Sequence, residues 1–585
     1  MGIYSSIRQV NLNNKTKIAV SMTMDSGAVK KYTYGTLFAK SEQYARQLER
    51  SGIGQGDRVI LVGENSPQWQ MAFLGIMKLK ATAVLIDASL STKDLKSLIE
   101  KSDARCIYTS EKVKEKLGAS APYRVPIMNL DDEGRPFKDS YKVLSPFIPR
   151  TEDGDSNIAL IIYSSAITQS AAGIMHTHNA MIKTVRMMAK ENGLTSYERI
   201  LSILPNSHIY GMVTCVLGSM LLGASLHYVE SITSEHLLNA FRTFKPTVFP
   251  GVPNVFEVFE KQIIEKIESK EMTKHIYEYL YPLCERVRQQ TGIKLGKIIF
   301  RSAHKEFGGK LRLMTSIGAL LDEKTAAFYY TLGFDLLITY GLTETNIPVI
   351  GNRIENINTD SCGKPYPRIE VILAHPDETG EGEIYIRSPY MMQGYFRDEE
   401  ATKVAFDEDG WFKTGDLARV DEKGNVKMTG HSKENTVLDI ESQYIKIPCI
   451  NELVMSEMPS TKEHDEIHAA HEKRILKWIQ ERGARLSEYI KLGKDYCLEK
   501  ISKLSLQKLK SYLLKKDTSE AEEQEVLQPQ EEKIVQSVES NKMCEEITSA
   551  ELISSQYDEE EEEEEISLKE LLGCDLEIDL VQEEK

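Results

Sequence analysis

Residues 34–87 alternate between two kinds of segment, and this alternation limits the fold more than any other feature. YGTLFAKSEQYARQLERSG (34–52) spaces its apolar side chains as an amphipathic helix does and stops at a glycine, and residues 68–81 repeat the helical spacing. DRVILVG (57–63) and TAVLID (82–87) are short apolar runs typical of buried strands. Helices that alternate with apolar strands predict a parallel β-sheet covered by helices on both faces.

The pattern changes farther along the chain. Beyond about residue 355, short strand-like segments are separated by Gly, Pro and Asp turns, which predicts a β-rich portion. Residues 463–515 are mostly helical and basic. Residues 517–585 contain no Phe or Trp, so we expect them to be disordered. Within them, 566–581 have the pattern of a short amphipathic helix that forms on a protein partner; the alternative is a solvated tail without one.

The acidic tail also accounts for the charge of the chain. Residues 517–585 hold 25 Asp and Glu and 4 Lys, a net charge of −21, whereas the whole chain carries −16, so residues 1–516 carry +5. Residues 1–516 are therefore nearly neutral and lack the excess of basic residues typical of a nucleic-acid-binding protein. We expect no nucleic-acid partner. The 8 cysteines form no CxxC pair, which favours a reducing, cytoplasmic location.

The longest apolar stretch, GMVTCVLGSMLLGASL (211–226), is short for a membrane span and rich in small residues. We therefore predict a buried helix there and no transmembrane segment. Peripheral contact with a membrane stays open.

Three segments carry residues suited to nucleotide chemistry. The first, YSSAITQSAAGIMHTH (163–178), lies between an apolar strand and a helical pattern. A strand, a small-residue loop and a helix in succession direct backbone N–H groups toward a phosphate, and the hydroxyls of Ser164, Ser165 and Thr168 add donors. An ordinary Ser/Ala-rich loop is the alternative interpretation.

The second segment, ITYGLTETNIPVI (338–350), runs from an apolar strand into Tyr340 and Gly341, followed by Thr343 and Glu344. Hydroxyl and carboxylate groups at the end of a strand suit a Mg-nucleotide. The third segment, residues 409–434, contains Thr414-Gly-Asp416. We expect a tight turn there that presents a carboxylate to the hydroxyls of a sugar.

In this order and at these distances, the three segments resemble the adenylate-forming superfamily, which includes acyl-CoA synthetases, beetle luciferase and the adenylation domains of peptide synthetases. The resemblance is strong over residues 30–435 and weak over 436–515. Other matching motifs are TYG (33–35), GDRV (56–59), NSPQW (65–69), LPNSHIYGM (204–212), PTVFPGVPNVFE (246–257), LRLMTSIGALL (311–321), GKPYP (363–367), GEIYIRSP (382–389) and MMQGYFRDEEAT (391–402). The segments at 246–257 and 311–321 are most similar to long-chain acyl-CoA synthetases.

The resemblance implies an α/β fold. A large N-terminal domain, residues 1–429, would hold two α/β sheets and a β-rich subdomain. A small, abridged α+β domain at 430–516 and the disordered acidic tail at 517–585 would follow.

The resemblance also implies roles for single residues. The predicted catalytic residues are His208 beside the carboxylate and acyl pocket, Thr343, Glu344 and Lys508. Glu344 is the predicted Mg²⁺ ligand. The predicted nucleotide-binding residues are Ser164, Ser165 and Thr168 in the phosphate loop, Gly318, Ala319, Tyr340 and Gly341 around the adenine, Thr343 at the phosphates, and Asp416 and His431 at the ribose.

The chain departs from the family pattern in three places. In the phosphate loop, Ala166, Gln169, Ala171 and Ala172 replace two glycines, a proline and a lysine. Losing a charge-assisted contact of roughly 1.5–3 kcal/mol predicts a ten- to hundredfold handicap. His431 replaces an arginine, and it is shorter and mostly neutral at pH 7.

The third departure is the abridged C-terminal domain. LSEYIKLGKDYCLEKISKLSLQKLKSYL (486–513) resembles the closing stretch of the family, which aligns Lys508 with the lysine that bridges carboxylate and phosphate. Lys503 and Lys510 are alternatives, and one more cation on a basic helix is another. Nearby, HDEIHAAH (464–471) lacks the glutamate of a zincin motif, so we predict a solvated helix face and no metal site there.

Together these features predict an AMP-forming acid–CoA ligase-like protein. It would activate a hydrophobic, long-chain fatty or related carboxylic acid with ATP and Mg²⁺, and CoA would accept the acyl group. The alternative is a pseudoenzyme that binds nucleotide or acyl ligand and acts as a scaffold, with a protein partner on the acidic tail.

The tail should be dispensable for folding and adenylation, because like charges at this density repel one another and resist packing. Truncation after Lys516 should leave the melting temperature and any pyrophosphate exchange nearly unchanged. A truncated protein that misfolds or loses ligand binding would show that the tail is part of the active fold.

Overall fold

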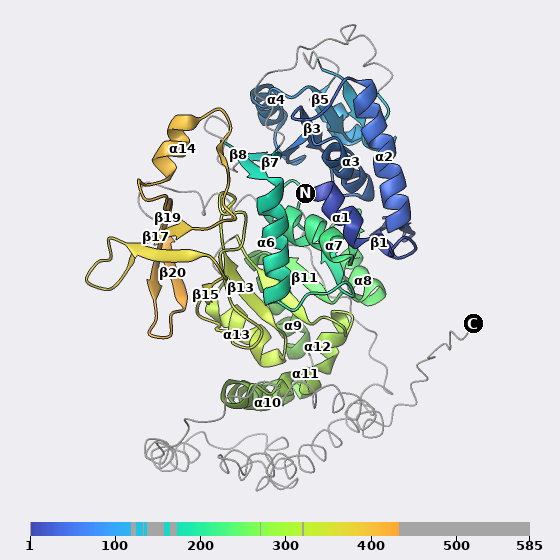
Figure 1. The fold of residues 1–585 in the computed structure, drawn as a ribbon. Helices are drawn as coiled ribbons and strands as arrows, with labels where there is room; N and C mark the ends of the chain where they lie inside the picture. Colours follow the sequence, from blue (N-terminus) through green and yellow to red (C-terminus); the bar gives the residue numbers. More distant parts are fainter. Residues whose placement is uncertain are drawn as a thin grey trace, which may run out of the picture. The chain divides into compact units, whose positions relative to one another are not determined.

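The computed structural model describes residues 2–118, 125–132, 134–136, 157–163, 172–269, 271–318 and 321–431. All of them belong to one unit of the chain, Met1–Ser456. They form two large sheets, one small sheet and the surrounding helices (Figure 1). This confirms the predicted α/β class with two α/β sheets and a β-rich portion. Apart from residues 430 and 431, the predicted C-terminal domain and the acidic tail lie outside the described residues.

The first large sheet has seven strands in the order β18-β8-β7-β4-β3-β5-β6. Neighbours from β7 to β6 are parallel, and β8 and β18 are added in antiparallel pairings. The strands are β3 (Arg58–Val62), β4 (Thr82–Ile86), β5 (Cys106–Thr109), β6 (Ile127–Asn129), β7 (Ile158–Tyr163), β8 (Gly173–Thr177) and β18 (Gly394–Tyr395).

Both faces of this sheet are covered, as the uninterrupted apolar runs predict. Val59 and Leu61 of β3 belong to the main core. Ile60 and Val62 face the opposite way, into a second core with Leu95 of α4 (Thr92–Lys101). Because successive residues of a strand point to opposite faces, a strand buried on both faces must be apolar throughout.

The second large sheet has nine strands in the order β15-β14-β13-β12-β11-β9-β10-β1-β2. Its strands from β13 to β1 are parallel, so their carboxyl ends lie at one edge. The strands are β1 (Ile18–Thr23), β2 (Val29–Thr33), β9 (Arg199–Ser202), β10 (Ser225–Val229), β11 (Val248–Gly251), β12 (Leu313–Ser316), β13 (Leu336–Tyr340), β14 (Ile350–Gly351) and β15 (Lys364–Pro365).

The β-rich portion is an antiparallel sheet in the order β16-β17-β19-β20. Its strands are β16 (Glu370–Ala374), β17 (Gly382–Arg387), β19 (Phe412–Val420) and β20 (Val426–His431).

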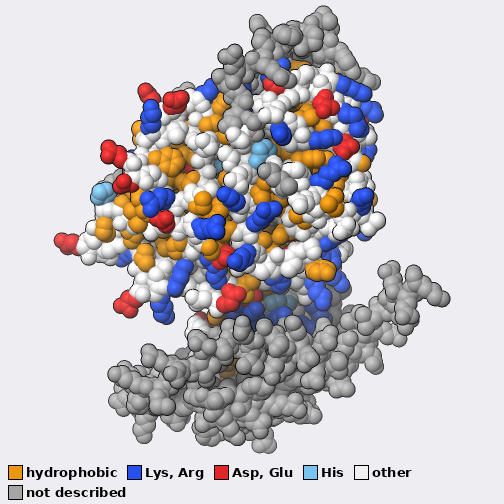
Figure 2. All heavy atoms as spheres, in the orientation of Figure 1, with side chains coloured by type: hydrophobic (Ala, Val, Ile, Leu, Met, Phe, Trp, Pro, Cys, Tyr) orange, Lys and Arg blue, Asp and Glu red, His pale blue; other side chains and the backbone are white. Residues whose placement is uncertain are grey.

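On the face shown in Figure 2, charged side chains of both signs are interspersed with apolar ones over the described residues.

Helices follow the strands in the expected places, and short polar residues begin several of them. In NSPQW, the Ser66 hydroxyl accepts a hydrogen bond from Trp69 N, and Pro67 occupies the first turn. The remaining helices are α1 (Ile3–Val10), α2 (Tyr34–Arg50), α3 (Pro67–Lys78), α5 (Glu111–Leu117), α6 (His178–Glu191), α7 (Gly218–Leu222), α8 (Ser234–Phe244), α9 (Pro253–Glu268), α10 (Glu271–Thr291), α11 (Leu295–Ile299), α12 (Arg301–Glu306), α13 (Glu323–Leu332), α14 (Glu399–Ala405) and the π-helix η2 (Gly211–Leu217).

The apolar stretch at 211–226 is buried, as predicted, but it is not one helix. It forms η2 and α7 and then enters β10, with a left-handed Gly223 ending α7. None of the described helices combines the length and the apolar character needed to cross a bilayer.

The arrangement predicted around the small-residue loop is wrong in one respect. Residues 173–177 are not part of a loop that opens a helix; they form β8, which returns antiparallel to β7. Residues 164–171, which separate β7 from β8 in the sequence, lie outside the described residues. Helix α6 begins at the opposite end of β8, where His178 N donates to Asn157 O at 3.1 Å. The N-terminus of α6 therefore lies roughly 16 Å from the start of β8, the length of five strand residues.

Strand β8 contains a histidine that the fold leaves without a partner. His176 is 0% exposed, and neither ring nitrogen has a hydrogen-bond partner among the described residues. Burial lowers the pKa of His176 to about 3. The folded-state pKa therefore lies below the ordinary value of about 6.5. As pH falls below about 6.5 the unfolded chain takes up this proton first, and stability is lost.

We expect His176→Leu to raise the free energy of unfolding by about 1–3 kcal/mol at pH 7, because it removes a buried unpaired polar group. It should also reduce the loss of stability between pH 6.5 and 5. Urea unfolding at both pH values measures this. His275→Leu, at an exposed position on α10, serves as the control and should change little. A destabilised His176→Leu protein would show that the ring makes a contact worth more than its burial costs.

Candidate active site

Two neighbouring parallel strands end where the adenine site was predicted. Ser316 of β12 pairs in register with Ile338 of β13, and the Thr339 hydroxyl donates to Ser316 O at 3.2 Å. Tyr340 ends β13, and Gly318 follows β12 with a φ of +96°. The structure thus brings Gly318 and Tyr340 to the same edge of the nine-stranded sheet, as the sequence predicted.

The turn after β13 buries the predicted phosphate- and cation-binding groups. Thr343 is 2% exposed and Glu344 is 8% exposed. Gly341 allows the chain to fold back closely, because a Cβ atom at this position would lie 3.1 Å from the Cα of Pro348. Main-chain proximity at Gly341 therefore explains the glycine, independently of any ligand.

Asp416 does not lie on a tight turn, which corrects the sequence-based prediction. It lies inside β19, where the pairing with β17 shifts register between Glu383 and Tyr385. Within this irregularity Gly415 has a φ of +75°, and the Thr414 hydroxyl donates to Ile384 O at 2.7 Å. A bulge re-aims side chains along a strand. The TGD motif is therefore a bulge that keeps Asp416 buried, with an exposed fraction of 3%.

The bulge brings Asp416 to the end of β13. The Tyr340 hydroxyl donates to Asp416 Oδ2 at 2.5 Å, and both side chains are buried. Burial and the nearby Asp416 carboxylate raise the pKa of Tyr340. Two residues predicted at neighbouring parts of a nucleotide, the adenine and the ribose, therefore contact each other directly.

Glu344 has a second tyrosine as its partner. The Tyr395 hydroxyl donates to Glu344 Oε1 at 3.1 Å, and Met392 N donates to Glu344 O at 2.8 Å. Burial raises the pKa of Glu344; hydrogen bonds from its own backbone N–H and from the Tyr395 hydroxyl oppose this, and the nearby Asp416 charge adds to it. The two carboxylates Glu344 and Asp416 are thus close enough to influence each other.

His208 lies in the loop between β9 and η2. Tyr210 N donates weakly to His208 Nδ1 at 3.4 Å, which favours the tautomer with its proton on Nε2. Burial lowers the pKa of His208 to about 4, although the Asp87 carboxylate opposes this shift. The ring is therefore neutral at pH 7, with its proton on Nε2.

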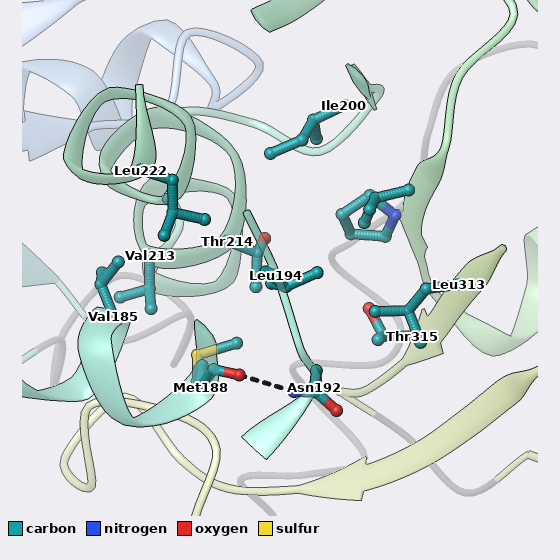
Figure 3. Close-up of a pocket in the computed structure, with 13 residues that line it drawn as sticks. Val185, Met188, Asn192, Leu194, Ile200, Val213, Thr214, Leu222, Leu313 and Thr315 are labelled. Carbon is teal, nitrogen blue, oxygen red and sulfur yellow. Dashed lines mark hydrogen bonds between the residues drawn. The ribbon is translucent and has the colours of Figure 1, made fainter. Parts of the chain in front are cut away.

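An apolar pocket lies between the nine-stranded sheet and α6, η2 and α7 (Figure 3). Its empty space, including the part open to solvent, is about 460 Å³. The Tyr210 hydroxyl forms a 2.6 Å hydrogen bond with Thr315 Oγ1, and Thr315 lines the pocket. Because Tyr210 follows His208 by two residues, this contact connects the His208 loop to the pocket wall. The lining residues are Val185, Met188, Asn192, Leu194, Ile200, Val213, Thr214, Gly218, Leu222, Val248, Pro250, Leu313 and Thr315.

Several predicted site residues cannot be placed. Ser164, Ser165, Thr168, Ala319 and Lys508 lie outside the described residues. Of His431 only the backbone is described, and it pairs with Asp416 between β20 and β19. The backbone position agrees with a residue near the predicted ribose site, and the role of the side chain stays a prediction.

Two structural residues of the site were missed by the sequence analysis. The Asn65 side chain donates to Leu204 O at 2.7 Å and accepts from Asn206 N at 2.8 Å, so it holds the loop that carries His208. Asn65 belongs to the NSPQW motif, and Tyr395 belongs to MMQGYFRDEEAT. Both motifs were noted, but sequence distance hides the contacts that these two residues make.

Comparison with known proteins decides the family. Residues 8–396 match the family model described as AMP-binding enzyme, which is well over half of the chain. The chain belongs to the AMP-binding enzyme family. This confirms the resemblance to adenylate-forming enzymes seen in the sequence.

Relatives in this family are acid–CoA ligases by name. Long-chain-fatty-acid–CoA ligase 2 of Schizosaccharomyces pombe is 28% identical over 394 residues, which is 63% of this chain and 56% of the yeast protein. Malonate–CoA ligase of Arabidopsis thaliana is 26% identical over 475 residues, 72% of this chain and 71% of the plant protein. The fold is similar to that of the anthranilate CoA ligase AuaEII in complex with anthranoyl-AMP, with a TM-score of 0.57, 20% identity and coverage of 77% and 82% of the two chains.

If Asp416 of this AMP-binding protein meets a ribose, Asp416→Ala should weaken Mg-ATP binding by about ten- to hundredfold, because a hydrogen bond to a charged group contributes roughly 1.5–3 kcal/mol. Isothermal calorimetry measures the change. Asp409→Ala removes an exposed carboxylate upstream in the same segment and should leave the affinity unchanged. Unaltered binding in a folded Asp416→Ala protein would remove Asp416 from the site.

Proposed function

We propose that the chain is an AMP-forming acid–CoA ligase for a hydrophobic carboxylic acid. The observation that carries the proposal is the convergence of the buried residues Thr343, Glu344 and Asp416 at the carboxyl end of β13. In the proposed reaction a carboxylate oxygen bonds to the α-phosphorus of ATP and pyrophosphate leaves. The thiol of CoA then bonds to the acyl carbon and AMP leaves.

The residues at the end of β13 fit a Mg-nucleotide. Mg²⁺ prefers oxygen ligands and is usually held by one or two carboxylates together with substrate phosphates. Glu344 supplies such a carboxylate and Thr343 a hydroxyl, both buried. When bound, the cation would neutralise phosphate charge. The protein holds Glu344 in place through Tyr395, and Asp416 offers acceptors to the ribose diol.

His208 suits the carboxylate end of the acid. A neutral imidazole that accepts a hydrogen bond at Nδ1 keeps its proton on Nε2, from which it can donate to an oxygen. Because burial lowers its pKa to about 4, the ring adds no positive charge at pH 7. It therefore orients the acid rather than pairing with it as an ion.

The pocket lining suits an apolar acyl group. Apart from the amide of Asn192 and the hydroxyls of Thr214 and Thr315, its lining side chains are apolar. Binding sites for small molecules are mostly apolar, with few polar groups that set orientation. The name of the yeast relative supports a long-chain acid, whereas the name of the plant relative shows that acids in this family also differ in polarity.

Use of CoA rests on the names of the relatives. The comparisons give no support to the pseudoenzyme alternative, although the changes in the phosphate loop favour slow turnover. The same experiment tests both the reaction and the choice of acid.

Carboxylate-dependent exchange of pyrophosphate into ATP should be detected, and it should increase with acid chain length until the pocket is filled. Each buried methylene contributes about 0.8 kcal/mol, or roughly fourfold in kcat/KM. Absence of exchange with every acid, in a protein that binds Mg-ATP, would contradict catalysis of the first step.

Two opposite changes at the pocket wall test whether this pocket holds the acid. Val213→Phe should shift the preferred acid to shorter chains, and Val213→Ala should shift it to longer ones, because Val213 lines the pocket and is 1% exposed. Val404→Phe, at an exposed position of α14, is the control and should leave the preference unchanged. An unaltered profile in both folded Val213 variants would place the acid elsewhere.

A further inference from the structure

One short segment contacts Glu344 twice. Met392 N donates to Glu344 O at 2.8 Å, and the Tyr395 hydroxyl donates to Glu344 Oε1 at 3.1 Å. Both the main chain and the carboxylate of Glu344 are therefore fixed by residues 392–395. Among the described residues, Tyr395 is the one side chain that donates to this carboxylate.

The same segment forms the edge of the sheet that carries the loop hairpin. Gly394 pairs with Met175 and Tyr395 with Ile174 of β8. Gln393 N donates to Met175 O at 2.7 Å, and Phe396 N donates to Gly173 O at 2.6 Å. The residues that hold Glu344 are thus hydrogen-bonded to β8.

Local contacts also fix the direction of the Tyr395 side chain. Tyr395 N donates to the Thr402 hydroxyl of α14 at 2.9 Å. Gly394 has a φ of +143°, and a Cβ atom there would lie 2.9 Å from Thr402 Cγ2. Only glycine allows this close approach without strain. The backbone on both sides of the Tyr395 Cα is therefore constrained, and the ring is aimed at Glu344.

From this geometry we propose that Tyr395 is a positioning residue, which holds the Glu344 carboxylate for the divalent cation of a bound nucleotide and links it to strand β8. The proposal rests on the proposed function, in which Glu344 meets that cation. A hydroxyl on one carboxylate oxygen restricts the side chain while leaving it charged and able to bind a cation. A ligand group supported by such a partner binds better than one free to rotate.

The test is calorimetry of the full-length protein with α,β-methylene-ATP, either with Mg²⁺ or with EDTA. Tyr395→Phe should weaken binding of the Mg²⁺ form about ten- to hundredfold, as expected for losing the hydrogen-bond partner of a metal-binding carboxylate, and leave the Mg²⁺-free form unchanged. The Mg²⁺ concentration at half-saturation should rise by a similar factor. Tyr390→Phe makes the same chemical change in the same segment, at a hydroxyl without a hydrogen-bond partner among the described residues, and should alter neither form.

A double-mutant cycle identifies the route of the effect. If Tyr395 acts through Glu344, adding Tyr395→Phe to Glu344→Gln should cause no further loss of Mg²⁺-dependent affinity. Equal losses with and without Mg²⁺, or additive losses in the double variant, would reduce Tyr395 to a packing role and overturn the proposal. If Glu344→Gln weakens the Mg²⁺ form and Tyr395→Phe does not, this inference fails and the proposed function stands. If the wild-type protein binds no nucleotide, the proposed function fails, and this inference fails with it.

Discussion

The pairing of residues 393–396 with β8 is the contact on which the candidate site depends. It attaches the segment that holds Glu344 to the seven-stranded sheet, whereas Glu344 itself follows β13 of the nine-stranded sheet. A second link runs from Asn346 Nδ2 to the Thr184 hydroxyl of α6, the helix that follows β8 and runs from the first sheet toward β13 in Figure 1. Because packed interiors are nearly incompressible, these links set how β8 and the end of β13 are arranged.

The two carboxylates at this junction are costly to bury. Glu344 and Asp416 are 8% and 3% exposed, and each receives a hydrogen bond from one tyrosine. Neutral hydroxyl donors compensate only part of the desolvation of a charge, and like charges nearby add to the cost. The raised pKa of Glu344 agrees with a buried carboxylate whose desolvation is only partly compensated. A bound cation and the hydroxyls of a sugar would compensate the remaining desolvation of the two carboxylates. Burying Glu344 and Asp416 therefore costs folding stability but favours ligand binding.

The sequence predicted the parallel strands well, because strands buried on both faces leave an unmistakable apolar run, as in β3 and β13. It also predicted that Thr343 and Glu344 follow such a strand. It failed at β8 and at the TGD bulge. In β8 the partly polar sequence GIMHT resembles a loop, and its strand conformation depends on pairing with β7 and β18. The Asp416 bulge is set by its partner β17, so a local pattern that resembles a turn was misleading.

A glycine near the β7–β8 connection can be needed for packing or for phosphate binding, and the tertiary contacts distinguish these two reasons. Gly173 matches the glycine that ends the family's phosphate-loop pattern, and a Cβ atom there would lie 3.0 Å from Ile161 Cγ2 and 3.2 Å from Phe396 Cβ. Packing between β7, β8 and the segment after β18 therefore requires it whether or not a phosphate binds. The positions that differ from the family pattern, Ala166, Gln169, Ala171 and Ala172, precede β8 in the sequence. The chain thus has the glycine that packing of the strands needs, and differs from the family pattern at the residues assigned to phosphate binding. Any nucleotide affinity must then depend more heavily on the buried groups at the end of β13 and in the β19 bulge, which the contacts between the sheets hold in place.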